Sequence, residues 1–211
     1  MCFSAKASLF SFTVGIIGSL LSISLGSLKD QIVGYFFGFV SLMQGIEYLL
    51  WTHQKCDLYN RLISFLGMFL NHLQPLVLGF IILLLNKNTG NKHWIYLLML
   101  AYLLIIVPYS LQFFSVDKEK QCTLKNTENH LQWNWNLLKY NRIIYLLFLF
   151  TMSALFLIGL PPLKSGRIFA LGAILTYTTS AILYRNNNVG ALWCYYTAFI
   201  PLTYYFLRIL F

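Results

Sequence analysis

Residues 94–115, WIYLLMLAYLLIIVPYSLQFFS, form an unbroken run without a charged side chain. An α-helix needs about 20 apolar residues to cross the hydrocarbon core of a bilayer. The run is continuous and does not alternate between apolar and polar positions, which favours a helix over a strand of a β-barrel. This segment therefore predicts a transmembrane helix.

Similar apolar runs lie on both sides of this segment and fill nearly the whole chain. Of the 211 residues, 58% are hydrophobic and 10% are charged, whereas a soluble domain normally carries about 25% charged residues. We therefore predict an all-α, polytopic transmembrane bundle of seven helices that forms a single domain over residues 1–211. The predicted spans are 8–27, 32–52, 62–85, 94–115, 142–160, 168–184 and 190–210, and the long loop is 117–141.

The net charge of +9 is spread over the ends of these segments. Basic residues in short loops are typical of membrane topology, so we expect membrane lipids, and no nucleic acid, as partners. Seven spans place the termini on opposite sides, which we name side A for the N-terminus and side B for the C-terminus. Side A receives nine basic residues and side B six, which favours a cytosolic side A. The side-A set is Lys6, Lys55, Arg61, Lys118, Lys120, Lys125, Lys139, Arg142 and Arg185, and the side-B set is Lys29, Lys87, Lys92, Lys164, Arg167 and Arg208.

Small residues recur at helical spacing on the first two spans. Such residues let helix backbones approach closely in a membrane, where lipid provides no hydrophobic drive for association. We predict contacts between helices of one chain, and a homo-oligomer is the alternative that no further motif supports. The residues are Gly15, Ser19, Ser22 and Gly26 on the first span and Gly34 and Gly38 on the second.

Two neighbouring spans carry polar side chains inside the predicted membrane region. At about 1.5 Å per residue, Glu47 lies roughly 7 Å and His72 roughly 15 Å from the side-A surface. A carboxylate at such a depth must be paired, neutral or hydrated, and its role is either functional or a structural hydrogen bond. We predict a shared polar intramembrane cluster in the side-A half of the bundle. Its members are Gln44, Glu47, Asn71 and His72.

The four cysteines all fall on side A in this topology. Cys56 and Cys122 lie in loops that join different helices and would form a disulfide if side A faces an oxidising compartment. If side A is cytosolic, free thiols, acylation of Cys2 or metal binding are favoured instead. The sequence leaves both alternatives open.

A metal centre could draw its ligands from separate parts of the chain. Thiolate, imidazole and carboxylate ligands suit zinc or copper. The usual close spacings, such as C-x-x-C or H-E-x-x-H, are absent from the sequence, which weakens this interpretation. The candidate ligands are Cys2, Glu47, His72 and Cys194.

The long loop contains two tryptophans, Trp133 and Trp135. Indole rings are favoured at the headgroup level of a bilayer. We therefore expect these two side chains to lie at the membrane interface.

Three short patches of the chain resemble a known family. They are the opening Met1-Cys2-Phe3-Ser4-Ala5, Glu47 followed by Trp51 in the second span, and Trp193-Cys194 in the last span. Together they resemble a family of uncharacterised multi-pass membrane proteins of bacteria and large DNA viruses that begin with the same five residues. The resemblance implies a multi-pass location, in a host membrane if the chain is viral, but no activity or cofactor. The family-like positions are Cys2, Glu47, Trp51 and Cys194.

Three functional hypotheses follow. The first is a non-enzymatic membrane protein with a structural or accessory role. The second is a small-solute, ion or proton pathway that uses Glu47 and His72, and the third is a thiol- or metal-dependent membrane enzyme. We favour the first, and lean against an enzyme, because so few polar side chains lie within the spans.

Overall fold

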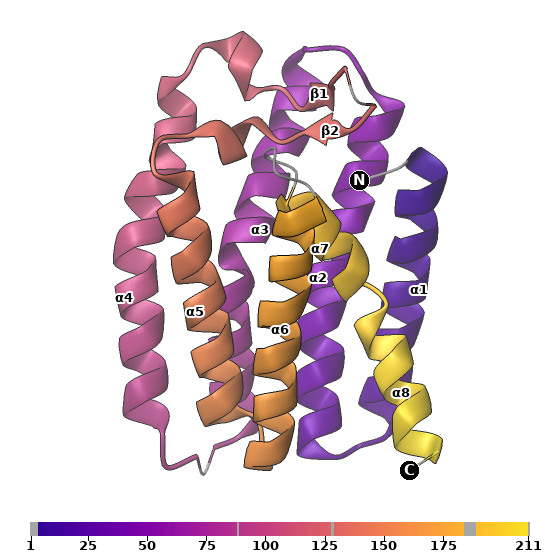
Figure 1. Ribbon diagram of the computed structural model, residues 1–211, viewed down its shortest axis with the longest axis vertical. Helices are drawn as coiled ribbons and strands as arrows, with labels where there is room; N and C mark the ends of the chain where they lie inside the picture. Colours follow the sequence, from indigo (N-terminus) through magenta and orange to yellow (C-terminus); the bar gives the residue numbers. More distant parts are fainter. Residues whose placement is uncertain (1–3, 88, 128, 184–188, 211) are drawn as a thin grey trace.

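The computed structural model describes residues 4–87, 89–127, 129–183 and 189–210. Its long helices lie side by side and run alternately in opposite directions along one bundle (Figure 1). The predicted all-α fold is confirmed. The helices are α1 Ala5–Ser24, α2 Leu28–Thr52, α3 Leu58–Leu85, α4 Lys92–Leu111, α5 Asn141–Gly159, α6 Leu163–Leu183, α7 Val189–Thr197 and α8 Ile200–Leu210.

Five helices are long and apolar enough to cross a membrane: α1, α2, α3, α5, and α4 together with the 3-10 turn that extends it to Ser115. These helices make the chain an integral, multi-pass membrane protein. Helix α6 has 21 residues but is not one of these five, and Lys164 and Arg167 lie near its start. Helix α1 begins and α8 ends at opposite ends of the bundle, which correspond to side A and side B (Figure 1).

The predicted span 190–210 is not one continuous helix, and this prediction is wrong in detail. Helix α7 ends at Thr197 and α8 begins at Ile200. Pro201 has no N–H, and its ring would clash with the carbonyl of the residue four positions earlier, which is Thr197. The proline therefore explains why the helix stops there. Helix α8 continues toward side B beside α1 (Figure 1).

The predicted loop 117–141 contains regular structure. It holds the 3-10 helices η2 Lys118–Gln121 and η3 Asn134–Leu137, and the short antiparallel strands β1 Leu124–Lys125 and β2 Leu131–Gln132. In the strand pair, Leu124 lies opposite Gln132 and Lys125 opposite Leu131. We refer to the described residues 116–127 and 129–140 as the cap, because they cover the side-A end of the bundle (Figure 1).

The small residues of α1 pack against other helices of the same chain. A Cβ atom on Gly18 would lie 2.4 Å from the main-chain nitrogen of Leu202 on α8. A Cβ on Gly34 of α2 would lie 2.8 Å from the carbonyl oxygen of Ser19. Such contacts require glycine. The contact between Gly34 and Ser19 is one of those predicted within one chain, whereas the contact of Gly18 with α8 was not predicted.

Gly26 has a different role from the one predicted. Its φ is +83°, and a Cβ placed on it would meet no atom within 4 Å. Glycine adopts this left-handed conformation readily and commonly terminates helices. Gly26 therefore ends α1 and starts the turn to α2, and it makes no helix–helix contact of the kind predicted.

Candidate functional site

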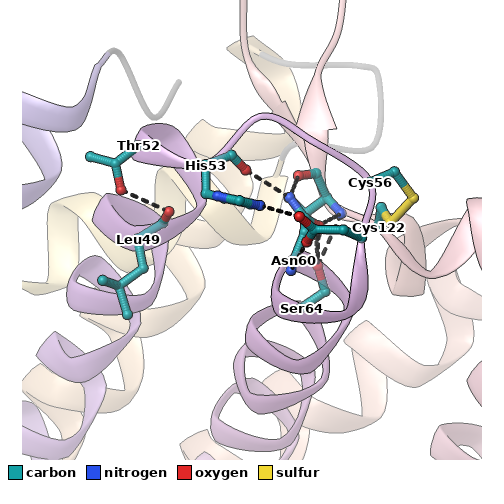
Figure 2. Close-up of polar contacts among 9 residues, drawn as sticks. Leu49, Thr52, His53, Cys56, Asn60, Ser64 and Cys122 are labelled. Atoms are coloured by element: carbon teal, nitrogen blue, oxygen red, sulfur yellow. Dashed lines mark hydrogen bonds and ion pairs between the residues drawn. A yellow bond between two sulfur atoms is a disulfide. The ribbon is translucent and has the colours of Figure 1, made fainter.

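The cap is joined covalently to the loop between α2 and α3. Cys56 forms a disulfide with Cys122, with 5.5 Å between their Cα atoms and a sequence separation of 66 residues (Figure 2). This pairing is one of the two alternatives that the sequence left open. It removes both thiols from the set that could be acylated or bind a metal.

Buried hydrogen bonds seat the cap on the first turns of α3 (Figure 2). The Asn60 side-chain amide donates to the carbonyl oxygens of His53, at 2.9 Å, and Thr123, at 3.0 Å. The main-chain N–H of Thr123 donates in return to Asn60 Oδ1, at 2.9 Å, and to Ser64 Oγ, at 3.0 Å. Asn60, Ser64 and Thr123 are all fully buried. Such a satisfied buried network is expected to fix the cap in one orientation.

An exposed carboxylate caps α3 beside this network. The main-chain N–H of Asn60 donates to Asp57 Oδ1, at 3.0 Å, and this bond is the largest cause of a pKa for Asp57 below its usual value. The His53 ring lies 2.7 Å from Asp57 Oδ2 and lowers that pKa further. Asp57 thus stabilises the start of α3 in its charged form.

The two cap tryptophans are buried inside the protein, and their position at the headgroup level stays a prediction. Trp133 and Trp135 stack with their ring centroids 5.0 Å apart, and both side chains are almost completely buried. The Tyr109 hydroxyl on α4 donates to the carbonyl oxygen of Trp135, at 3.0 Å. A Cβ on Gly67 of α3 would lie 3.1 Å from the Trp135 ring. The indoles therefore fill the space between the cap and the bundle.

The predicted polar cluster is divided among several helix contacts. Gln44 on α2 accepts a hydrogen bond from the Ser11 hydroxyl on α1, at 2.8 Å. Asn71 on α3 donates to the Tyr145 hydroxyl on α5, at 3.2 Å. His72 Nδ1 lies 2.8 Å from the Ser110 hydroxyl on α4. Successive residues of a helix point about 100° apart, so neighbours on α3 reach different helices.

Glu47 and Cys194 belong to the interior part of this set. Both side chains are fully buried, and they lie within electrostatic range of each other. The Gln74 side-chain amide on α3 donates to Cys194 Sγ, at 3.9 Å. Trp51, the remaining family-like residue on α2, is half-buried against the core. Thus α3 and α7 bring Gln74 and Cys194 into contact, and His72 reaches Ser110 on α4.

The proposed metal ligands do not form a site in the part of the chain that the structure describes. No group of three His, Cys, Asp or Glu side chains in metal-binding range occurs there. Cys2 lies outside the described residues.

A groove of about 510 Å³ opens between α6, α8 and the start of α2. A second pocket of about 270 Å³ continues from it toward the middle of the bundle, and the two share Ile168, Phe169 and Ile200. Aromatic rings of α2 and α5, including Phe36 and Phe156, line the inner pocket. The two pockets together form what we call the α6–α8 groove.

Two basic side chains line the side-B end of this groove. Arg208 Nε donates to Asp30 Oδ1, at 3.2 Å, and the Tyr204 hydroxyl donates to the same oxygen. Asp30 is fully buried and also accepts from the Ser27 hydroxyl. The Lys29 ammonium lies 5.7 Å from the centre of the Tyr204 ring. The groove is therefore apolar along its length and cationic at its mouth.

A third pocket, of about 210 Å³, lies between α3 and α4 beside His72 and Ser110. Its other walls are apolar, and its side chains include Phe65 and Phe114. Within the described structure, His72 Nε2 is buried and has no hydrogen-bond partner. Neither this pocket nor the α6–α8 groove is lined by Glu47.

Sequence reasoning missed the α6–α8 groove and its basic residues. Its walls come from helices α2, α5, α6, α7 and α8, so no local pattern reveals it. Two signals were nevertheless present: Pro201, which divides the last helix, and Arg208 within an otherwise apolar last helix. A comparison of the chain with protein-family models, curated proteins and solved structures found no match.

Proposed function

We propose that this protein has a non-enzymatic, accessory role in the membrane and binds a lipid in the α6–α8 groove. The observation that carries the proposal is the groove itself, whose outer part has a volume of about 510 Å³. Small-molecule sites typically occupy about 300–1,000 Å³ and are lined mainly by apolar and aromatic side chains. An acyl chain is the apolar ligand that a bilayer supplies beside such a groove.

The burial and the hydrogen bonds of the potentially reactive side chains support a non-enzymatic role. Cys194 and Glu47 are fully buried, and Gln74 already donates to the Cys194 sulfur. The Gln44 carbonyl accepts from Ser11 in the same region. Buried polar groups that bond to one another stabilise contacts between membrane helices. A catalytic thiol would instead need to be accessible to its substrate.

The disulfide supports an orientation for the protein. Disulfides persist in oxidising compartments and are rare in the cytosol, so the Cys56–Cys122 bond favours a side A that faces away from the cytosol. The count of basic residues favours the opposite orientation, but four of the nine on side A belong to the folded cap. We give the disulfide more weight because the bond depends directly on the compartment. The side-A residues in the cap are Lys118, Lys120, Lys125 and Lys139.

We also propose that this chain is related to the multi-pass family described above, because the opening residues Met1 to Ala5 resemble those of the family. Such a relationship suggests a common role in the membrane. If the chain is encoded by a large DNA virus, the membrane is that of the host.

Lipid retained during purification tests the proposed function. A Cβ on Gly172 would meet no atom within 4 Å, and this residue lines the inner pocket, so Gly172→Phe should fill the groove without disturbing the backbone. Ala101→Phe adds the same ring to an exposed position of α4 and is the matched control. We expect native mass spectrometry in mild detergent to detect bound lipid on the wild type and on Ala101→Phe, and much less on Gly172→Phe. Equal retention by both variants would contradict the proposal.

A second candidate function is a proton or ion pathway, favoured by the buried carboxylate of Glu47 near Cys194. An ionisable residue inside a membrane is a common mark of such a pathway. Flux measurements in proteoliposomes discriminate the two functions. A pathway predicts flux that Glu47→Gln abolishes, whereas the lipid-binding function predicts no flux in either protein.

A further inference from the structure

The mouth of the α6–α8 groove combines a cationic end with hydroxyl groups. Lys29 and Arg208 line it, together with the hydroxyl-bearing side chains of Ser165, Thr203 and Tyr204. The walls beyond them are apolar, and they continue into the inner pocket through Phe169 and Ile200. This polarity matches an amphiphile with an anionic head and an apolar tail.

Asp30 holds Arg208 at the mouth of the groove. It accepts from only some of the N–H donors of the Arg208 guanidinium. The contact runs through Nε, at 3.2 Å from Asp30 Oδ1. A guanidinium carries five N–H donors in a fixed fork and commonly binds phosphate through two of them. The Arg208 side chain is 40% exposed, whereas that of Asp30 is completely buried. Arg208 can therefore donate to a ligand while Asp30 keeps it in place.

The surrounding surface reinforces the positive charge at this end of the groove. Lys164 and Arg167 lie near the start of α6, on either side of Ser165, and both are exposed. The topology assigns six basic residues to side B, and Asp30 is the one acidic residue in that part of the sequence. Net positive charge at a membrane surface attracts acidic lipids.

We propose that the α6–α8 groove selects an acidic glycerophospholipid from the leaflet on side B. Its phosphate binds between Lys29 and Arg208, and one acyl chain runs past Phe169 and Ile200 into the inner pocket. This inference rests on the proposed lipid-binding function and adds the class of headgroup. A zwitterionic choline lipid fits less well, because its trimethylammonium group would lie among basic side chains.

The orientation that we propose from the disulfide agrees with an acidic lipid as the ligand of the groove. If the cap faces an oxidising compartment, side B faces the cytosol. The cytosolic leaflet is the one that carries acidic lipids such as phosphatidylserine and phosphatidylinositol. The groove would then open where its ligand is concentrated.

A competition experiment tests the headgroup. The wild type is reconstituted in nanodiscs with equal amounts of phosphatidylserine and phosphatidylcholine, and retained lipid is identified by native mass spectrometry. We expect a preference for phosphatidylserine that falls about fivefold in Lys29→Gln, because one basic residue near a membrane surface contributes about 1 kcal/mol. Lys87→Gln removes the same charge from an exposed turn on side B that does not line the groove, and it should keep the preference.

Two further measurements separate the outcomes. Raising the salt concentration should weaken the wild-type preference, since exposed charges are screened, and this needs no variant that might unfold. Equal preferences in Lys29→Gln and Lys87→Gln, or no preference in the wild type, would overturn the acidic headgroup. If Gly172→Phe still displaced lipid in that case, the proposed function would stand; if it displaced none, the proposed function would fail as well.

Discussion

The close approach of α1 to the backbone of α8 at Gly18 provides a quantitative test of the fold. A Cβ atom at position 18 would lie 2.4 Å from the main-chain nitrogen of Leu202 and 2.7 Å from its Cα. Carbon and nitrogen atoms in ordinary contact are at least about 3.4 Å apart, so Gly18→Ala forces α8 to move by about 1 Å. Because the obstacle is backbone and not a flexible side chain, rotation of a side chain cannot relieve it.

We expect Gly18→Ala to lower the free energy of unfolding by about 1–3 kcal/mol, the usual cost of overpacking. Gly172→Ala is the matched control, since its new methyl group would meet no atom within 4 Å. The control should be neutral or slightly stabilising, because alanine is a better helix former than glycine. Reversible unfolding in mixed detergent micelles, followed by circular dichroism, measures both. Equal stabilities of the two variants would refute the close packing of α1 on α8.

Three other predictions concern the cap, the groove and the start of α3. Cys56→Ser should abolish the difference in gel mobility between reduced and unreduced protein and increase hydrogen exchange in the cap; a wild type without such a difference would contradict the disulfide. Asp30→Asn should lower the free energy of unfolding by about 1.5–3 kcal/mol, the usual value of hydrogen bonds to a charged group, whereas Asp117→Asn, at an exposed pair, should leave it unchanged. The lowered pKa of Asp57 means that its stabilising effect is complete above the ordinary aspartate pKa of about 3.9 and is lost as the pH falls through the folded-state value. The free energy of unfolding, measured against pH, should therefore fall at acid pH, and it should fall less in Asp57→Asn. An identical decrease in both proteins would argue against stabilisation of α3 by Asp57.

The helices of the bundle could be predicted because apolar length alone decides whether a segment can cross a bilayer. The run 94–115 illustrates this, since α4 and its 3-10 extension cover it from Lys92 to Ser115. The break before Pro201 was not predicted, because the length of a hydrophobic run gives no information about the N–H that proline lacks. The local conformation of Gly26 was missed for a similar reason, since spacing does not reveal a positive φ.

The candidate sites were less predictable because they depend on directions and on distant segments. Asn71 and His72 are neighbours in the sequence, yet one reaches α5 and the other α4. The Cys56–Cys122 disulfide could be proposed only as an alternative, because the order of the spans gives the side of each cysteine but not the distance between them. The groove needed α2, α6 and α8 to be placed in space before Lys29 and Arg208 could be seen together.

The cap and the α3–α4 turn lie at opposite ends of the bundle and are therefore expected on opposite sides of the membrane. Lys139→Cys in the cap and Lys87→Cys in the turn place exposed thiols at these two positions. In sealed membrane vesicles of known orientation, a membrane-impermeant maleimide should label the cap reporter from the non-cytosolic side, and it should label the turn reporter from the cytosolic side only. Labelling of both reporters from the same side would contradict the topology, and with it the orientation of the groove.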